Sequence, residues 1–300
     1  MHILLIAGGW SNEREVSLAG ARSIRHALDE LGHEVTVVDP AEDLHRLFDL
    51  AGSSDFAFIN LHGAPGEDGL IQAVLDAVGC PYQGSGPAGS MLALNKAMAK
   101  ELFTLAGIPT PRWEFLPHHP GDRWVCSLDF PLFVKPNQGG SSLGMSMARD
   151  EAELDQAMLE IFASGQEVLL EELIQGQELT CAVLGQEALP PILIRPPESA
   201  PYFDYHAKYT PRACEEICPA PVDPDIVREI RELSLRAHSC LGLKGYSRAD
   251  FMCSKNKLYI LEVNTLPGMT QTSLLPLAGR TAGYSFAELV SRLIQLGMDS

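Results

Sequence analysis

Two apolar runs near the end of the chain are joined by only four polar residues, Ser254-Lys255-Asn256-Lys257, a pattern typical of a β-hairpin. The first run carries Asp250, and the second carries Glu262 and Asn264. Because side chains alternate along a strand, Glu262 and Asn264 share a face, and pairing of the strands brings Asp250 toward them. Three such oxygen ligands suit Mg²⁺ bound together with phosphates. The alternative is that they are solvated residues at strand ends, although Asp and Asn are depleted in strands.

The first 88 residues alternate between strand-like and helix-like segments. The expected strands are 2–7, 35–38 and 56–61, and the expected helices are 13–31 and 69–78. This alternation predicts a parallel α/β sheet with right-handed crossovers. Ligands of such sheets bind at the carboxyl ends of the strands. Polar clusters occur at two of these ends, at residues 8–15 and 62–68.

After residue 88 the pattern changes to an α+β texture. The expected strands are 131–135, 145–148, 168–172, 179–185 and 188–194, and the expected helices are 90–106, 151–162, 224–241 and 286–296. The Pro-rich segment 195–221 is expected to be a lid without regular structure, since loops of this length in compact domains are usually functional. We therefore expect three domains, 1–88, 89–180 and 181–300, the last of which holds the lid and the metal-binding hairpin.

The composition limits the class of partner. A formal net charge of −17 argues against nucleic acid, because its phosphate backbone binds basic proteins. No apolar run is as long as a membrane span, and the N-terminus lacks the basic region and cleavage site of a signal peptide. The seven cysteines are scattered, and Cys214 and Cys218, the close pair, have no His at zinc spacing. We expect reduced thiols in a cytoplasmic protein that does not bind membranes.

A glycine-rich segment follows a strand-like run that includes Lys135. Residues 137–144 read Asn-Gln-Gly-Gly-Ser-Ser-Leu-Gly. The bare backbone N–H groups and hydroxyls of such a loop can fold over phosphates, and Lys135 can add a positive charge. Farther along, Glu171 can accept a hydrogen bond from an exocyclic amine, and Glu178 can accept from ribose hydroxyls. The sequence thus predicts a nucleotide site, with a mobile surface hairpin as the alternative.

Two short motifs match other functions but lack the structural context that those functions need. Residues 84–89 have the glycine spacing of a dinucleotide-binding fingerprint, but no clear strand precedes them and no acidic residue ends a second strand at the required distance. Residues 140–144 have the spacing of a hydrolase nucleophile elbow, but a strand-like run follows instead of a helix. We therefore expect neither nicotinamide binding nor a serine nucleophile.

Several polar motifs occur in a fixed order along essentially the whole chain. They are Gly8-Gly9-x-Ser11-x-Glu13-Arg14-Glu15, His62-Gly63-x-x-Gly66-Glu67-Asp68-Gly69, Val134-Lys135-Pro136 with Gly140-Ser141-Ser142-x-Gly144, Asp204-Tyr205-x-Ala207-Lys208-Tyr209, Arg248-x-Asp250-Phe251, and Glu262-Val263-Asn264-Thr265-x-Pro267-Gly268-Met269-Thr270-x-x-Ser273. Together they resemble ATP-grasp ligases, and among these the D-alanine–D-alanine ligase family. The resemblance implies an α/β and α+β chain, in which an N-terminal parallel-sheet domain precedes the ATP-grasp fold.

The resemblance also implies a reaction. ATP phosphorylates the carboxylate of one D-alanine, and the amine of a second D-alanine attacks the acyl phosphate to form D-alanyl-D-alanine for peptidoglycan. Phosphorylation is needed because a carboxylate is a poor electrophile. The site must neutralise phosphate charge, stabilise an oxyanion and exclude water. The implied cofactor is Mg²⁺, with two ions and Mn²⁺ as a substitute, and the implied assembly is a homodimer.

For the nucleotide, the resemblance assigns roles to residues from several motifs. Asp250, Glu262 and Asn264 are the implied metal ligands, with Glu262 bridging two ions. The implied phosphate contacts are Lys96, Lys135 and the loop residues Gly140 and Ser142. The implied contacts to adenine and ribose are Glu171, Leu173 and Glu178.

For the amino acids, the resemblance implies that Glu13 holds the ammonium of the first D-alanine and that His62 lies near its carboxylate. Arg248 and the Gly268 N–H would form the oxyanion site. Ser273 and the Leu274 N–H would bind the carboxylate of the second D-alanine, and Glu67 would orient Ser273. Ser141, Tyr209 and Glu13 would form a hydrogen-bonded lock when the lid 195–221 closes. Lys208 would face the transferring phosphate. Because the Lys208-Tyr209 pair is present, an amine nucleophile is favoured over a hydroxyl.

Three other functions stay open from the sequence: an ATP-grasp ligase that joins different amino acids, a non-catalytic nucleotide-binding protein, and an NAD oxidoreductase. The residues Glu13, Tyr209 and Ser273 distinguish a D-alanine–D-alanine ligase from the first of these alternatives. Asn95, Gly139 and His206 depart from the residues usual in the family.

Overall fold

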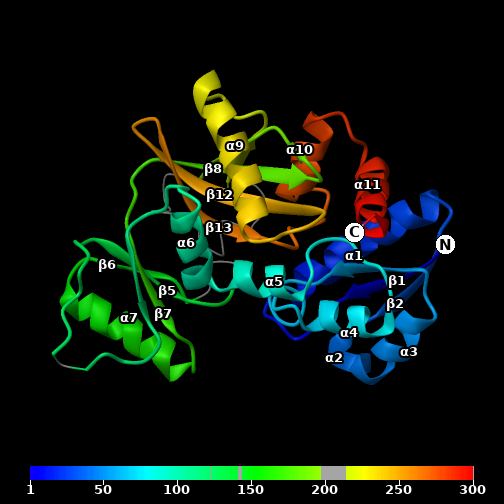
Figure 1. The fold of residues 1–300 in the computed structure, drawn as a ribbon, viewed down its shortest axis with the longest axis horizontal. Coiled ribbons are helices and arrows are strands. Elements are labelled where there is room, and N and C mark those ends of the chain that lie inside the picture. Colours follow the sequence, from blue (N-terminus) through cyan, green and yellow to red (C-terminus); the bar gives the residue numbers. More distant parts are fainter. Residues whose placement is uncertain (122, 141–143, 197–213, 300) are drawn as a thin grey trace.

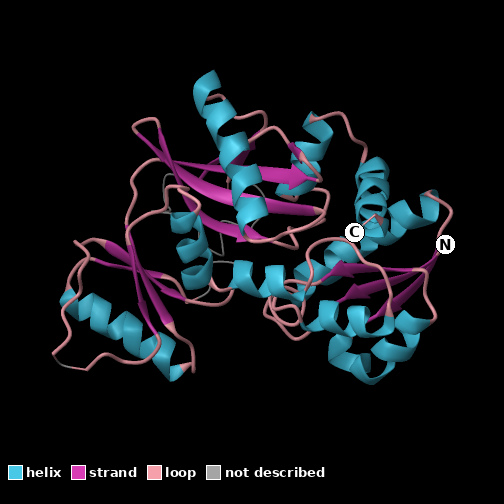
Figure 2. Cartoon of the chain, in the orientation of Figure 1, coloured by secondary structure: helices cyan, strands magenta, loops and turns pink. Residues whose placement is uncertain are grey.

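The computed structural model describes residues 1–121, 123–140, 144–196 and 214–299 (Figure 1). Its strands form three separate sheets, of three, four and six strands. Figure 2 shows each sheet with helices packed against it. Within these described ranges, no helix is both long and apolar enough to cross a membrane.

The N-terminal sheet has the strand order β2-β1-β3. Strand β1 (His2–Ala7) lies between β2 (Glu34–Val38) and β3 (Phe56–Asn60) and pairs with both in parallel. Strands that are covered on both faces are apolar at successive positions, and β3 is buried throughout. The connecting helices are α1 (Arg14–Glu30), α2 (Pro40–Asp43), the 3₁₀ helix Leu44–Arg46, α3 (Leu47–Gly52) and α4 (Leu70–Val78). The predicted parallel layer is confirmed.

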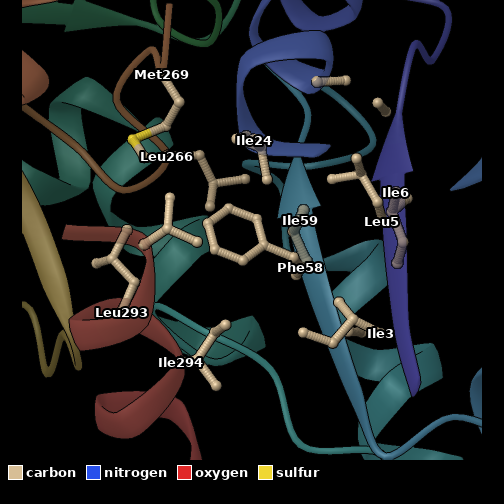
Figure 3. Close-up of a cluster of buried hydrophobic side chains, with 14 of the residues drawn as sticks. Ile3, Leu5, Ile6, Ile24, Phe58, Ile59, Leu266, Met269, Leu293 and Ile294 are labelled. Atoms are coloured by element: carbon tan, nitrogen blue, oxygen red, sulfur yellow. The ribbon is translucent and has the colours of Figure 1, made fainter. Parts of the chain in front are cut away.

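The end of the chain returns to this N-terminal sheet. Helix α10 (Leu274–Thr281) is followed by α11 (Phe286–Met298), which lies beside α1 and β3 (Figure 1). Figure 3 shows Phe58 of β3 facing Leu293 and Ile294 of α11 and Leu266 of the preceding loop. The sheet therefore shares its hydrophobic core with the last helix of the described chain.

The central sheet is antiparallel and has the order β4-β7-β5-β6. Its strands are β4 (Trp113–Leu116), β5 (Leu132–Pro136), β6 (Ser146–Ala148) and β7 (Val168–Glu172). Helix α7 (Glu151–Ala163) covers one face, and its buried residues join the sheet in a separate core cluster. Strand β4 has no counterpart among the strands expected from the sequence.

The C-terminal sheet has the order β11-β10-β8-β12-β13, and β9 pairs with β8. Its strands are β8 (Gln177–Leu184), β9 (Glu187–Ala188), β10 (Ile192–Arg195), β11 (Glu215–Ile217), β12 (Tyr246–Ser254) and β13 (Lys257–Asn264). Helix α9 (Pro224–Cys240) packs on it. The predicted hairpin is confirmed, because Asp250 pairs with Glu262 and Arg248 pairs with Asn264 across β12 and β13.

The single helix expected at 90–106 is wrong, because the chain forms α5 (Pro87–Leu94) and α6 (Lys96–Leu105) with a break at Asn95. Asn95 has extended backbone angles, and its side chain accepts a hydrogen bond from Met98 N–H. An N-cap of this kind compensates for an unpaired N–H at the start of a helix. The break starts α6 at Lys96, a predicted phosphate contact.

The single strand expected at 188–194 is also wrong. Pro190 and Pro191 have no N–H to donate to a ladder, and the chain forms β9 and β10 on either side of them. The expected lid 195–221 is not entirely irregular, since β11 pairs with β10 within it. Residues 197–213 of that segment lie outside the described residues.

Candidate active site

A cavity of about 470 Å³ lies between the central and C-terminal sheets. Its lining comes from β5, β6 and β7 on one side and from β8, β12 and β13 on the other. This volume is in the range of pockets that hold small organic ligands. Because the walls belong to two different sheets, a ligand in this cavity contacts both.

Part of the cavity wall is apolar. The apolar residues that line it are Phe133, Met145, Met147, Leu173, Ile174, Met252 and Leu261. A planar base would be buried between such side chains. Of this set, only Leu173 was predicted from the sequence to contact the nucleotide. The other side chains are ordinary in strands, and only the pairing of two sheets places them around one space.

Asp250 lies on the same cavity and is bound on both carboxylate oxygens. Its Oδ1 accepts from Arg248 Nε at 2.9 Å and from Thr180 Oγ1 at 2.6 Å. Its Oδ2 accepts from the Arg248 guanidinium at 2.8 Å and from Asn264 Nδ2 at 3.0 Å. A carboxylate has about four acceptor positions, so these four bonds use them all. A cation at Asp250 would therefore have to displace one donor.

Glu262 lies opposite Asp250 on β13, and also lines the cavity. Its Oε2 is 3.5 Å from Lys96 Nζ, and Lys96 donates to the Gly139 carbonyl at 2.6 Å. The predicted phosphate lysine therefore joins the metal-ligand strand to the glycine-rich segment. Within the described ranges, no three His, Cys, Asp or Glu side chains gather as a metal site by themselves. A metal here needs the Asn264 amide and further oxygens, such as those of phosphates.

Lys135 points along β5 toward Glu171 on β7. Its Nζ is 2.5 Å from Glu171 Oε1 and 5.3 Å from the centre of the Phe133 ring. The other oxygen of Glu171, Oε2, is 2.5 Å from Lys100 Nζ. Burial favours the neutral carboxyl, but the two ammonium groups outweigh it and hold the pKa of Glu171 below its ordinary value. Glu171 thus bridges two lysines, rather than presenting a free oxygen to an exocyclic amine as expected.

Glu178, the predicted ribose contact, lines the cavity from β8. It pairs with Ile194 on one side and Met252 on the other, so it occupies an interior strand of the sheet.

A second group of polar residues lies at the carboxyl ends of the N-terminal strands. His62 and Glu67 follow β3, as the sequence predicts, whereas Glu13, expected as the first residue of the helix 13–31, immediately precedes α1. Glu67 accepts from Gly63 N–H at 2.8 Å and from the Leu266 backbone. Burial, together with the nearby Glu13 carboxylate, raises the pKa of Glu67 to about 7. The site therefore holds carboxyl groups that are not all ionised at neutral pH.

His62 is buried, and its Nε2 has no hydrogen-bond partner among the described residues. Burial lowers the pKa of His62, and the Glu13 carboxylate and a bond to the Leu266 backbone oppose that effect. A buried polar atom without a partner is costly. A ligand group beside His62 would satisfy it.

Gly268 and Ser273 lie close together in the loop after β13. A Cβ at Gly268 would be 2.9 Å from Ser273 Oγ. Ser273 Oγ accepts from Thr270 N–H at 3.0 Å, so the expected partner, Glu67, bonds elsewhere in this structure. Ser273 is the N-cap of α10 and makes no side-chain cap bond, and Leu274 is the first helical residue. The N–H groups at this helix start point to an anion site.

The glycine-rich segment approaches Glu13. A Cβ at Gly140 would lie 3.3 Å from Glu13 Oε2. Ser141, Ser142, Lys208 and Tyr209 lie outside the described residues, so their roles stay predictions.

Lys100 is a site residue that was not predicted from the sequence. The signal is its place on α6: Ala97, Lys100 and Phe103 recur at helical spacing, and all three are buried. A lysine on the buried face of a helix is rarely found without a paired charge.

A family model and two curated relatives all match this chain to D-alanine–D-alanine ligases. A family model described as the C-terminus of D-ala D-ala ligase matches residues 102–295. A D-alanine–D-alanine ligase of Oleidesulfovibrio alaskensis is 57% identical to this chain, over 99% of this chain and 97% of its own length. A D-alanine–D-alanine ligase of Maridesulfovibrio salexigens is 55% identical, over 99% of this chain and 98% of its own length.

Solved structures agree as well. A D-alanine–D-alanine ligase from Bacillus anthracis, solved in complex with ATP, has a TM-score of 0.88 at 34% identity and covers 100% of this chain and 97% of its own. A VanG D-Ala:D-Ser ligase from Enterococcus faecalis has a TM-score of 0.83 at 28% identity, with 99% of each chain covered. This chain belongs to the D-alanine–D-alanine ligase family and has the ATP-grasp fold that its motifs predict.

Proposed function

We propose that this protein joins two D-alanine molecules at the expense of ATP, and so supplies D-alanyl-D-alanine for peptidoglycan synthesis. The observation that carries the proposal is a single cavity lined by Asp250, Glu262, Lys96 and Lys135, with apolar side chains along the same walls. Carboxylates for a metal, ammonium groups for phosphates and an apolar space for a base are the parts that a nucleotide needs.

The residues divide the chemistry between two places. In the cavity, Lys96 and Lys135 bind the nucleotide phosphates, and Glu178 and the backbone near Leu173 bind ribose and adenine. Mg²⁺, held by Asp250, Glu262 and Asn264, neutralises phosphate charge when it is bound. Turning the Asn264 amide would replace its N–H bond to Asp250 with an oxygen ligand to the metal.

At the N-terminal strand ends, Glu13 binds the ammonium of the first D-alanine, and His62 lies near its carboxylate. Arg248 and the Gly268 N–H stabilise the oxyanion that forms when the second amine attacks. Ser273 and the Leu274 N–H hold the carboxylate of the second D-alanine, and Glu67 orients this loop through Leu266. Ser141, Ser142, Lys208 and Tyr209 complete the site by resemblance alone.

Three further features belong to the same proposal. The chain has three domains, 1–88, 89–180 and 181–300, although the second boundary falls within β8 and α11 packs on the N-terminal sheet. The protein acts in the cytoplasm, where its seven free thiols stay reduced. It is a homodimer, which sedimentation at twice the chain mass of 32.6 kDa would support and sedimentation at that mass would refute.

The test is ADP release by the purified protein with ATP, Mg²⁺ and D-alanine, with L-alanine, D-serine and D-lactate in parallel. We expect ADP and D-alanyl-D-alanine in equal amounts with D-alanine, and no product with L-alanine or D-lactate. A mixed dipeptide that dominates when D-serine is added would assign a different second substrate. ATP binding without turnover of any of these substrates would overturn the proposal.

A further inference from the structure

Lys100 is a buried charge that the proposed reaction does not yet use. Its side chain is fully buried on α6, one helical turn after Lys96. Its Nζ is 2.5 Å from Glu171 Oε2 and donates to Thr110 Oγ1 at 2.7 Å. Burying an ammonium group is unfavourable, and contact with a single carboxylate offsets this only in part. Such a residue is rare without a partner whose charge it balances.

The partner of Lys100 is also the partner of Lys135. Glu171 contacts Lys135 through Oε1 and Lys100 through Oε2, both at 2.5 Å. Together, two ammonium groups and one carboxylate carry a net charge of about +1. Without Lys100, Lys135 and Glu171 would form a neutral pair. A neutral pair attracts phosphate only weakly, and Lys135 would have to leave Glu171 unpaired in order to reach it.

We propose that Lys100 is a positioning residue for nucleotide binding: it neutralises Glu171 and thereby leaves the charge of Lys135 available to the phosphates. Lys100 itself is covered by Glu171 and Thr110 and does not reach the cavity, whereas Lys135 and Glu171 line it. This inference rests on the proposed function, because it requires that ATP occupies this cavity.

The acid–base behaviour of Glu171 agrees with this charge balance. Burial lowers the pKa of Lys100 from its ordinary value, and the Glu171 carboxylate opposes that effect. The pKa of Glu171 is held below its ordinary value by Lys100 and Lys135 despite burial. Glu171 therefore stays ionised, and an ionised Glu171 in this position needs two cations if one of them is to serve a ligand.

A purely structural role is the competing explanation. Thr110 donates to the Ile260 carbonyl at 2.8 Å, so Lys100 also connects the central sheet to β13 through Thr110. A structural role predicts that loss of Lys100 weakens binding of every ligand of the cavity. A charge role predicts loss for phosphate-bearing ligands alone, and recovery when the charge of Glu171 is removed as well.

The experiment measures dissociation constants for ATP with Mg²⁺ and for adenosine by calorimetry. The variants are Lys100→Met, the double variant Lys100→Met/Glu171→Gln, and Lys257→Met, which removes an exposed lysine at the turn of the hairpin. We expect Lys100→Met to weaken ATP binding roughly tenfold to a hundredfold, as loss of one charge several ångströms from phosphate predicts. Adenosine binding should be unchanged, and the double variant should recover most of the ATP affinity.

Several results would overturn the inference. Wild-type ATP affinity in Lys100→Met would do so, as would parallel loss of ATP and adenosine binding that the double variant does not restore. A loss equal to that of Lys257→Met would mean that only the overall charge matters. Wild-type protein that does not bind ATP would refute the proposed function together with the inference, whereas wild-type binding with an unaffected Lys100→Met refutes the inference alone.

Discussion

Glu67 links the stability of this protein to pH in a direction opposite to that of most carboxylates. Burial and the nearby Glu13 raise the pKa of Glu67 from 4.5 to about 7. The folded protein therefore keeps a proton that the unfolded chain releases above pH 4.5. The stability that this group contributes is complete below that pH and is lost as the pH rises through 7.

The size of the effect follows from the same pKa values. A difference of one unit between the pKa values of a group in the folded and unfolded states corresponds to about 1.4 kcal/mol of unfolding free energy. The rise of the Glu67 pKa from 4.5 to about 7 thus corresponds to a loss of about 3 kcal/mol across that interval. Glutamine at this position keeps an oxygen for Gly63 N–H but cannot ionise. The Glu67→Gln variant should therefore lack this part of the pH dependence.

The assay is urea unfolding of wild-type protein and Glu67→Gln from pH 5 to pH 8, without nucleotide or Mg²⁺. The unfolding free energy of the wild type should fall relative to that of the variant by about 2 to 3 kcal/mol over this range. A carboxyl ¹³C titration, with the variant used for assignment, should show a midpoint near the pKa of about 7. A constant difference between the two proteins across the range would refute the reasoning.

Three further substitutions test other parts of the structure. Glu262→Gln should slow ADP release roughly hundredfold or more through weakened metal coordination, and a near-wild-type rate would contradict the metal assignment. Asn95→Ala removes the cap of α6 and should lower the unfolding free energy by about 1 kcal/mol in urea, whereas Asn95→Asp, which keeps the cap, should not. Gly176→Ala places a Cβ 2.1 Å from the Cys253 carbonyl oxygen and should lower the unfolding free energy by about 1 to 3 kcal/mol. Gly52→Ala, whose added Cβ has nothing within 4 Å, is the control. Equal unfolding free energies for the two variants would argue against the packing at Gly176.

The elements that could be predicted from the sequence are those whose pattern is local. The hairpin of β12 and β13 follows from period two and a short polar turn, so the facing of Asp250 and Glu262 could be anticipated. The parallel N-terminal layer follows from alternation of strands and helices. The order of the motifs, rather than any one of them, indicated the family.

The features that escaped prediction depend on contacts between distant residues. The break at Asn95 leaves the apolar spacing of the segment almost intact, and it is held by Asn137, which lies 3.1 Å from Asn95 and also accepts from Ala97 N–H. The contact between Lys100 and Glu171 joins residues from α6 and β7. Neither residue reveals its partner through sequence spacing, because burial of a paired charge is a property of the assembled core.

The packing of α11 on β3 has a consequence for synthesis. Domains of a nascent chain generally fold in the order in which they leave the ribosome. Here the N-terminal sheet has a face whose covering residues, Leu293 and Ile294, are translated much later than its strands. That face therefore stays uncovered until α11 has been translated. Stable folding of the N-terminal sheet thus depends on synthesis of α11, and a chain that stops before α11 is left with an exposed apolar surface.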